Sequence, residues 1–397
     1  MWTNSDIFDR ASKVEYLQGD MPNANGVTRA ITYQTEPYKN QPTRAFAYIG
    51  FPNTPMPKDG YPAVVVAHGG GGCAFYEWIE YWNGKGFVAI APDFYGNEYG
   101  SLTKKERDHC VGCIDEMPAG SFMNTAKEYR DSWTYHAVSN CILAYNVLRD
   151  TGKVNPEKIA MTGISWGSVV ACIVSGVDKR FKAFGVVYGG GFVYETPCFE
   201  KDTGYISRKG DSEWIACFDP ISYLPQNDKP TMFTFGADES CFSPWNNMRS
   251  ARLCKGEVCY AVKESLFHSH RWNDDDEMRH IYLFINSVIN GTPMPFTVQS
   301  AVLVENALFA KVDKPQSVER AKLVFTFSNL EEDSREWKWT STPATRTNDS
   351  FTAEIPTSAT AWFMEFTDNQ ANKMTEFIQS TEIFFRDEIT NENNQGE

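Results

Sequence analysis

The chain has 397 residues, of which 42% are hydrophobic and 22% are charged. That composition is ordinary for a globular protein and excludes a disordered, collagen-like or coiled-coil chain. No run of about 18 apolar residues is present, so we expect no membrane-spanning helix and no membrane partner. The 37 basic and 51 acidic residues leave a formal net charge of −14, which argues against nucleic acid as a partner because it repels phosphate backbones.

The N-terminal residues 1–6 lack the charged and apolar regions of a signal peptide. We therefore expect a cytoplasmic protein if Met1 is the native start, and a secreted or periplasmic one if a signal peptide was removed. The sequence indicates no particular oligomeric state.

The first elements along the chain are predicted strands. Residues 26–50 alternate polar and apolar side chains, as antiparallel strands do. Residues 62–67 and 86–91 are continuous apolar runs, which are typical of strands buried on both faces, and a helical pattern with Trp78 and Trp82 separates them. Further strands are predicted at 158–162, 184–188, 231–235 and 258–262, and helices at about 125–150, 167–177, 244–254 and 275–290. This alternation predicts an α/β fold with a mostly parallel sheet and helices on both faces.

Two stretches, 97–124 and 192–229, are much longer than ordinary connections and are expected to shape a binding site. After residue 295 the pattern changes to short alternating strands at 298–304, 322–327, 351–355 and 362–366. We therefore predict two domains, 1–295 and 296–397, the second a small β-sandwich of the immunoglobulin-like kind.

The strongest chemical signal is the sequence Gly-Ile-Ser-Trp-Gly at 163–167, which follows a predicted strand and opens a predicted helix. Gly-x-Ser-x-Gly in that context is a nucleophile elbow. The glycines are needed because the serine occupies a tight, strained turn where side chains on its neighbours would clash. Ser165 is therefore the candidate nucleophile, and the start of the helix favours the negative charge that develops beside it.

A second motif, His-Gly-Gly-Gly-Gly at 68–72, ends the strand at 62–67. A glycine run at this place lets backbone N–H groups point into a pocket. The run matches the His-Gly-Gly-Gly type of oxyanion loop. The predicted oxyanion donors are the N–H of Trp166 and one from Gly70, Gly71 or the next glycine. We expect His68 to brace the loop.

A serine nucleophile needs a base, and the base needs an acid that orients it. In this fold class the chain order is serine, acid, histidine, so the base belongs in His268-Ser269-His270 after the strand at 258–262. We favour His268, because a small residue follows it, and keep His270 as the alternative. The acid is expected just after the strand at 231–235, where residue type favours Asp238 and spacing from the preceding glycine favours Glu239. Both stay open, with a slight preference for Glu239.

The cysteines give no metal signal. Cys110 and Cys113 have the only suggestive spacing, but no second ligand pair follows, so we predict free thiols or a local disulfide rather than a zinc site. Cys141 and Cys172 fall in apolar helical patterns and are expected to be small buried side chains. The predicted acyl transfer needs neither a metal nor an organic cofactor.

These motifs are similar to those of a known family. Residues 131–138, 163–167, 178–183 and 188–192, together with the ending from His268 through Glu277 to 291–293, resemble bacterial α/β-hydrolases of the acetylxylan esterase or dienelactone-hydrolase-like type. The resemblance implies an α/β-hydrolase fold, followed by a C-terminal β domain. It also implies a serine carboxylesterase that acts on acylated carbohydrate, such as acetylated plant polysaccharide, or on a small ester.

Other functions remain open at this stage. A feruloyl-type or other small-ester hydrolase uses the same residues. A peptidase of the prolyl-oligopeptidase kind would require an N-terminal propeller, and about 60 residues before the strand at 62–67 are too few. A catalytically weak carbohydrate-binding protein is the alternative outside the enzymes. Of the eleven Trp residues, Trp78, Trp245 and Trp272 lie near the motifs and are candidates for stacking on a substrate, although tryptophan is usually buried.

Overall fold

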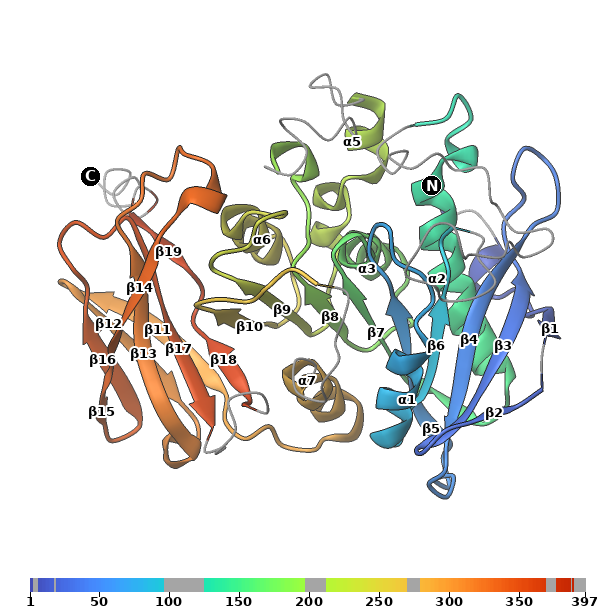
Figure 1. Cartoon of the computed structure of the whole chain (residues 1–397), viewed down its shortest axis with the longest axis horizontal. Coiled ribbons are helices and arrows are strands. Elements are labelled where there is room, and N and C mark those ends of the chain that lie inside the picture. The colour runs from blue at the N-terminus through green and yellow to red at the C-terminus, as the bar shows by residue number, and fades with distance from the viewer. Residues whose placement is uncertain are drawn as a thin grey trace.

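The computed structural model describes residues 1–2, 6–17, 19–95, 125–196, 212–269, 279–368, 376–386 and 388. Its centre is a mixed sheet whose strands run from the N-terminal part of the chain into the C-terminal part (Figure 1). The first ten strands are β1 (Val14–Tyr16), β2 (Met21–Pro22), β3 (Gly26–Gln34), β4 (Arg44–Pro52), β5 (Tyr61–Ala67), β6 (Val88–Pro92), β7 (Val154–Ile164), β8 (Phe184–Val187), β9 (Thr231–Gly236) and β10 (Val258–Lys263). The α-helices are α1 (Tyr76–Gly84), α2 (Trp133–Asp150), α3 (Trp166–Val177), α5 (Ser212–Phe218), α6 (Pro244–Arg252) and α7 (Arg279–Asn290).

Strands β5 to β10 pair in parallel, and β3 and β4 extend the sheet in antiparallel fashion. The spatial order is β3-β4-β6-β5-β7-β8-β9-β10. The predicted α/β architecture with a mostly parallel sheet is confirmed. Each of the six predicted central strands is present, because a strand covered by helices on both faces must be apolar at every position.

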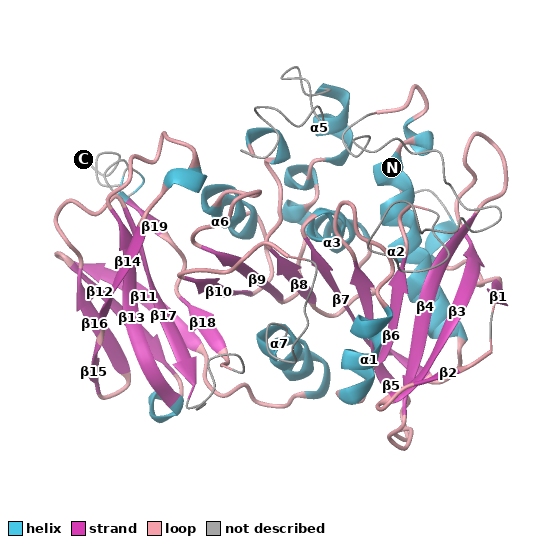
Figure 2. Ribbon diagram, in the orientation of Figure 1, coloured by secondary structure: helices cyan, strands magenta, loops and turns pink. Residues whose placement is uncertain are grey.

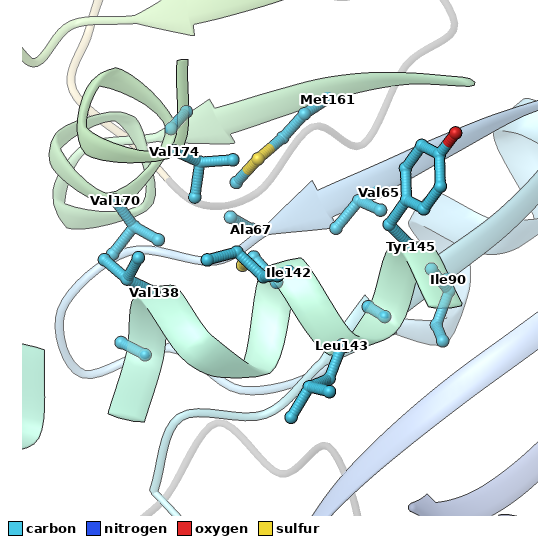
Figure 3. Packing of buried hydrophobic residues seen from close by; sticks show 14 of the residues in the cluster. Val65, Ala67, Ile90, Val138, Ile142, Leu143, Tyr145, Met161, Val170 and Val174 are labelled. Carbon is cyan, nitrogen blue, oxygen red and sulfur yellow. The ribbon is translucent and has the colours of Figure 1, made fainter. Parts of the chain in front are cut away.

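The strands are buried on both faces because helices cover each side (Figure 2). Val65 contributes to a cluster with α2 and α3, whereas its neighbours Val64 and Val66 contribute to a cluster with α1 and α7. This split follows from the alternation of side chains along a strand. Figure 3 shows the first cluster, in which Ile142 of α2 and Val170 of α3 lie over the sheet.

Within its described residues, the C-terminal β region contains the further strands β11 (Val298–Val304), β12 (Ala307–Val312), β13 (Val318–Thr326), β14 (Trp339–Pro343), β15 (Thr345–Thr347), β16 (Ser350–Glu354), β17 (Ala361–Asp368), β18 (Ile378–Ser380) and β19 (Phe384–Phe385). One layer is the sheet β11-β12-β16-β15, and the other is formed by β18, β17, β13 and β14. Side chains from both layers, such as Leu308 and Phe351 on one and Leu323 and Met364 on the other, share one buried cluster.

The two parts of the chain are joined through the sheet itself. β10, the last strand of the parallel part of the sheet, pairs with β18 in antiparallel fashion, with Tyr260 opposite Ser380. The Val262 N–H also donates to the Ser380 side-chain hydroxyl, at 2.9 Å. This pairing covers an edge strand that would otherwise expose unpaired backbone groups. The domain boundary near 295 stays a prediction. No helix in the described ranges is both long enough and apolar enough to cross a membrane.

Candidate active site

Ser165 sits between the end of β7 and the start of α3, as the elbow motif predicts. Its backbone has φ 55° and ψ −121°, a left-handed conformation that is rare for a residue with a side chain. The Ser165 N–H donates to the carbonyl oxygen of Val187 on β8, at 2.9 Å. The strained backbone of Ser165 places its hydroxyl beyond the carboxyl end of a parallel strand.

The glycines that flank the serine are required by close packing. A Cβ atom on Gly163 would overlap the carbonyl oxygen of Gly167, and one on Gly167 would overlap the carbonyl oxygen of Ala67. Buried Ser168 fixes the turn further, because its hydroxyl donates to the carbonyl oxygen of Gly163 and accepts from the Val187 N–H, each within 2.8 Å.

His268 and Glu239 complete a hydrogen-bonded chain with the serine. The His268 Nε2 atom lies 3.0 Å from Ser165 Oγ, and its Nδ1 atom lies 2.8 Å from Glu239 Oε1. The Glu239 Oε1 atom also accepts from the Cys241 N–H at 2.7 Å. Only 1% of Glu239 is exposed, so solvent competes little for this carboxylate. The arrangement matches a serine nucleophile, a base and an orienting acid.

Asp238 has a different place from its neighbour. Its Oδ2 accepts from the Ser265 hydroxyl, and its Oδ1 accepts from the Leu266 N–H at 3.0 Å. The two adjacent carboxylates therefore point in different directions, and it is Glu239 that meets the imidazole. Asp238 instead ties the chain segment that leads to His268 back to the end of β9.

Tyr188 holds the other side of the His268 segment and was not singled out by sequence analysis. Its hydroxyl donates to the Ser269 carbonyl oxygen and lies 3.3 Å from the Ser269 N–H. Its ring lies 4.3 Å from the imidazole of His268, measured between centroids. The sequence signal was its place at the end of the strand predicted at 184–188, next to the glycines at 189–191.

The pKa of His268 reflects opposing causes. Burial lowers this pKa, but the hydrogen bond to Glu239 and the negative charge of that carboxylate outweigh burial, with a smaller contribution from Cys241. The net effect raises the pKa of His268 above its ordinary value. A raised pKa stabilises the imidazolium that forms when the base accepts the serine proton.

The glycine loop after β5 contains the predicted oxyanion donors. The Gly71 N–H donates to the Tyr95 hydroxyl at 3.0 Å, and the Gly72 N–H donates to the Gly69 carbonyl oxygen at 3.1 Å. The Gly70 N–H has no acceptor within the described ranges. Trp166 is the first residue of α3, so its N–H belongs to the helix start beside Ser165. The oxyanion role of Gly70, Gly71 and Trp166 stays a prediction.

His68 braces this loop, as expected. Its Nδ1 lies 2.8 Å from the Gly69 carbonyl oxygen, and its Nε2 accepts from the Phe94 N–H at 3.0 Å. These contacts favour the neutral tautomer with its proton on Nδ1. Both ring nitrogens are thus occupied in holding the ends of β5 and β6 together.

The tryptophans near the motifs have different surroundings. Trp78 is 5% exposed and packs in the core beneath α1, where its ring contacts Phe75. Trp245, on α6, packs edge-on against Phe385 of the C-terminal β region, with ring centroids 4.5 Å apart. Packing therefore occupies both side chains, and the prediction that they stack on a substrate gains no support. Trp272 lies outside the described residues.

Two further predictions fall on residues that the structure does not describe. The alternative base His270 is one, and the pair Cys110 and Cys113 is the other. Cys141 and Cys172 are buried, as predicted.

The order of the strands and the position of the site identify the fold as the α/β-hydrolase fold. Residues 46–209 match the model of the Dienelactone hydrolase family. This match includes the elbow around Ser165 but ends before Glu239 and His268, so the places of those two residues rest on the geometry described above. A search of curated proteins finds no significant match.

Solved structures with the same fold come from several organisms. An acetyl xylan esterase from Paenibacillus sp. R4 superposes with a TM-score of 0.55 at 16% identity, covering 70% of this chain and 88% of that one. Acetyl Xylan Esterase 1 from Thermoanaerobacterium sp. JW/SL YS485 gives 0.53 at 12% identity, covering 67% and 87%. The acylaminoacyl peptidase of Pyrococcus horikoshii gives 0.52 at 14% identity, covering 67% of this chain and 42% of that one.

Proposed function

We propose that this protein is a serine carboxylesterase that removes acetyl or similarly small acyl groups from carbohydrate. The observation that carries the proposal is the hydrogen-bonded chain from Ser165 through His268 to Glu239 beyond the carboxyl ends of parallel strands. The choice of a carbohydrate ester draws on the likeness to two acetyl xylan esterases.

The proposed reaction has two steps. His268 Nε2 accepts the proton of Ser165 as Oγ attacks the ester carbonyl, and the N–H groups of Gly70 and Trp166 stabilise the oxyanion. The imidazolium then gives that proton to the leaving alcohol, which leaves an acyl group on Ser165. A water molecule, deprotonated by His268, attacks the acyl group, and the imidazolium returns that proton to Ser165 Oγ as the carboxylic acid leaves. Glu239 Oε1 accepts the hydrogen bond from His268 Nδ1–H throughout and orients the imidazole.

Aromatic side chains around the nucleophile elbow favour a substrate with a small acyl group. The Trp166 ring makes edge-on contacts with Trp133, Trp214 and Phe242, with centroids 6.1 to 6.4 Å apart. Phe242 in turn lies parallel to the His268 imidazole at 6.4 Å. Aromatic side chains thus fill the space around the start of α3.

A substrate panel tests this proposal. Wild-type protein and the Ser165→Ala variant as a blank are compared on acetylated xylo-oligosaccharides, a feruloylated oligosaccharide and an N-acetylaminoacyl anilide, with released acid or amine measured. We expect Ser165-dependent release of acetate with the highest kcat/KM on the acetylated sugars. A higher kcat/KM on the anilide would replace the esterase with a peptidase, and a higher value on the feruloylated sugar would replace the small acyl group with an aromatic one.

A further inference from the structure

A cysteine lies beside the base and acid of the site and has no place in the proposed reaction. Cys241 follows Glu239 by two residues, and its backbone N–H donates to Glu239 Oε1. One ligand atom from each of Glu239, Cys241 and His268 lies within 4.8 Å of the others. Cys241 is in no disulfide, and the residue is half-buried.

The acid contributes a second, independent observation. Glu239 Oε2 is buried and has no hydrogen-bond partner within the described ranges, whereas Oε1 holds His268 and the Cys241 N–H. A buried carboxylate oxygen without a partner is costly, unless a proton, a water molecule or a cation reaches it. Glu239 is also the residue whose carboxylate belongs to the same group as the Cys241 thiol and a His268 ring nitrogen.

We propose that Glu239, Cys241 and His268 form an inhibitory site for Zn²⁺ or a similarly thiophilic divalent cation. Sulfur, imidazole nitrogen and carboxylate oxygen are the ligands that zinc prefers, and three protein ligands leave a fourth position for water. Small rotations of the side chains bring atoms within 4.8 Å to the spacing that metal–ligand distances of about 2.0–2.3 Å require. The inhibitory effect rests on the proposed function, but the binding does not.

Inhibition follows from where the protons go. In the metal-free site, His268 carries its proton on Nδ1 and accepts the serine proton at Nε2. A cation bound at Nδ1 takes that position, so the imidazole proton moves to Nε2 and the thiol proton of Cys241 is released to solvent. With Nε2 protonated, His268 can no longer accept a proton from Ser165.

Binding is tested first in a protein that cannot turn over substrate. Metal-stripped, reduced Ser165→Ala protein is titrated with Co²⁺, which reports a thiolate ligand through a near-ultraviolet charge-transfer band. We expect the band in Ser165→Ala and its loss when Cys241→Ser is added. Cys254→Ser is the matched control, because Cys254 is also half-buried but its sulfur contacts Asn227 instead. A band that survives Cys241→Ser, or that is absent from Ser165→Ala, would overturn the site.

Inhibition is tested in the active protein. Hydrolysis of p-nitrophenyl acetate is measured against buffered free Zn²⁺, and each variant is normalised to its own rate without metal. The inhibitory concentration should rise in Cys241→Ser by at least the 10–100-fold that loss of an outer-shell partner costs, and should stay unchanged in Cys254→Ser. Equal sensitivity of Cys241→Ser and wild type would refute the proposal.

Two further points keep the outcomes separate. Should Cys241→Ser unfold on heating well below wild type, Cys241→Ala takes its place in both experiments. If wild type lacks hydrolytic activity but Cys241-dependent cobalt binding is present, the proposed function fails and the metal site stands. If activity is present without that binding, the metal site fails and the esterase stands.

Discussion

The parallel part of the sheet and the C-terminal β region place their polar groups differently. All seven residues of β5 are buried, so the chemistry of that part is concentrated beyond the strand ends, where Ser165, Glu239 and His268 meet. In the C-terminal region a strand such as β16 alternates between its two faces. The comparison shows that covering a sheet on both faces confines reactive side chains to one edge, whereas a sandwich distributes polar residues over its outer surfaces.

The C-terminal region also contributes charges where it meets the hydrolase sheet. Lys322 lies 2.6 Å from Glu264 and 3.0 Å from Glu365, and Glu365 accepts from the Glu264 N–H at 2.8 Å. Arg279 of α7 lies 2.9 Å from Asp368 of β17. Because Glu264 is four residues before His268, the first of these clusters holds the start of the segment that carries the base. We call it the seam cluster of Lys322, Glu264 and Glu365.

The largest expected effect comes from the strand-end carboxylates. Glu239→Gln should lower kcat by about 10⁴-fold, since the amide cannot hold the imidazole in its working tautomer and charge. Asp238→Asn should cost less than about tenfold, because the amide oxygen can still accept from the Leu266 N–H. Both kcat values are measured on p-nitrophenyl acetate. Equal losses in the two variants would remove the distinction between these neighbouring residues.

The pH dependence gives the next effect. His268 must be neutral to accept the serine proton, so kcat/KM should fall about tenfold per pH unit below its pKa, which is raised above the ordinary 6.5 by Glu239. A raised folded-state pKa stabilises the fold below pH 6.5 and loses that contribution as pH rises through it. Activity should therefore increase with pH while this contribution to the free energy of unfolding decreases. A pH–rate profile and urea titrations test both, and the acidic limb should move to lower pH in Glu239→Gln.

Substitutions in the seam cluster should have a smaller effect on stability and on activity. Lys322→Met leaves the carboxylates of Glu264 and Glu365 facing each other and should lower the free energy of unfolding by about 1–3 kcal/mol. The loosened His268 segment should also lower kcat several-fold, with KM little changed. Lys322→Arg, which keeps the charge, should recover most of both losses. Urea titrations and steady-state kinetics at one pH measure them, and an unchanged kcat in a destabilised Lys322→Met would limit the cluster to stability.

An exposed substitution on the sheet β11-β12-β16-β15 should have the smallest effect on stability and activity. Val302 on β11 is 53% exposed, so Val302→Ser should change the free energy of unfolding by no more than about 0.5 kcal/mol and leave kcat unchanged. A clear loss of activity on polymeric substrate alone would give this face a role in substrate binding.

Much of the hydrolase fold was predictable because its signals are local. Each of the six apolar runs and the elbow lies within a few residues of sequence, and so does each short segment in which the acid and the base were sought. The sequence pattern did not predict β12, although Glu305 and Asn306 form the short hairpin turn before it. Glu305 has φ 53°. The alternating pattern of β12 is brief and merges with that of β11.

Other features depend on contacts distant in sequence. The pairing of Tyr260 with Ser380 joins strands far apart in the chain, and the hydrophobic pattern of each strand does not predict its partner. The choice between Asp238 and Glu239 depends on the direction of each side chain, which the strand end and the Ser265 hydroxyl decide. Trp78 and Trp245 lie close in sequence to the motifs, yet core and seam packing determine their environments.

If Ser165 is the nucleophile, hydrolysis must depend on its hydroxyl. The kcat for p-nitrophenyl acetate is measured for wild type and for Ser165→Ala, with the folded state of each checked by thermal unfolding. We expect kcat to fall by about 10⁶-fold in a variant that remains folded. Activity within tenfold of wild type in folded Ser165→Ala would contradict it.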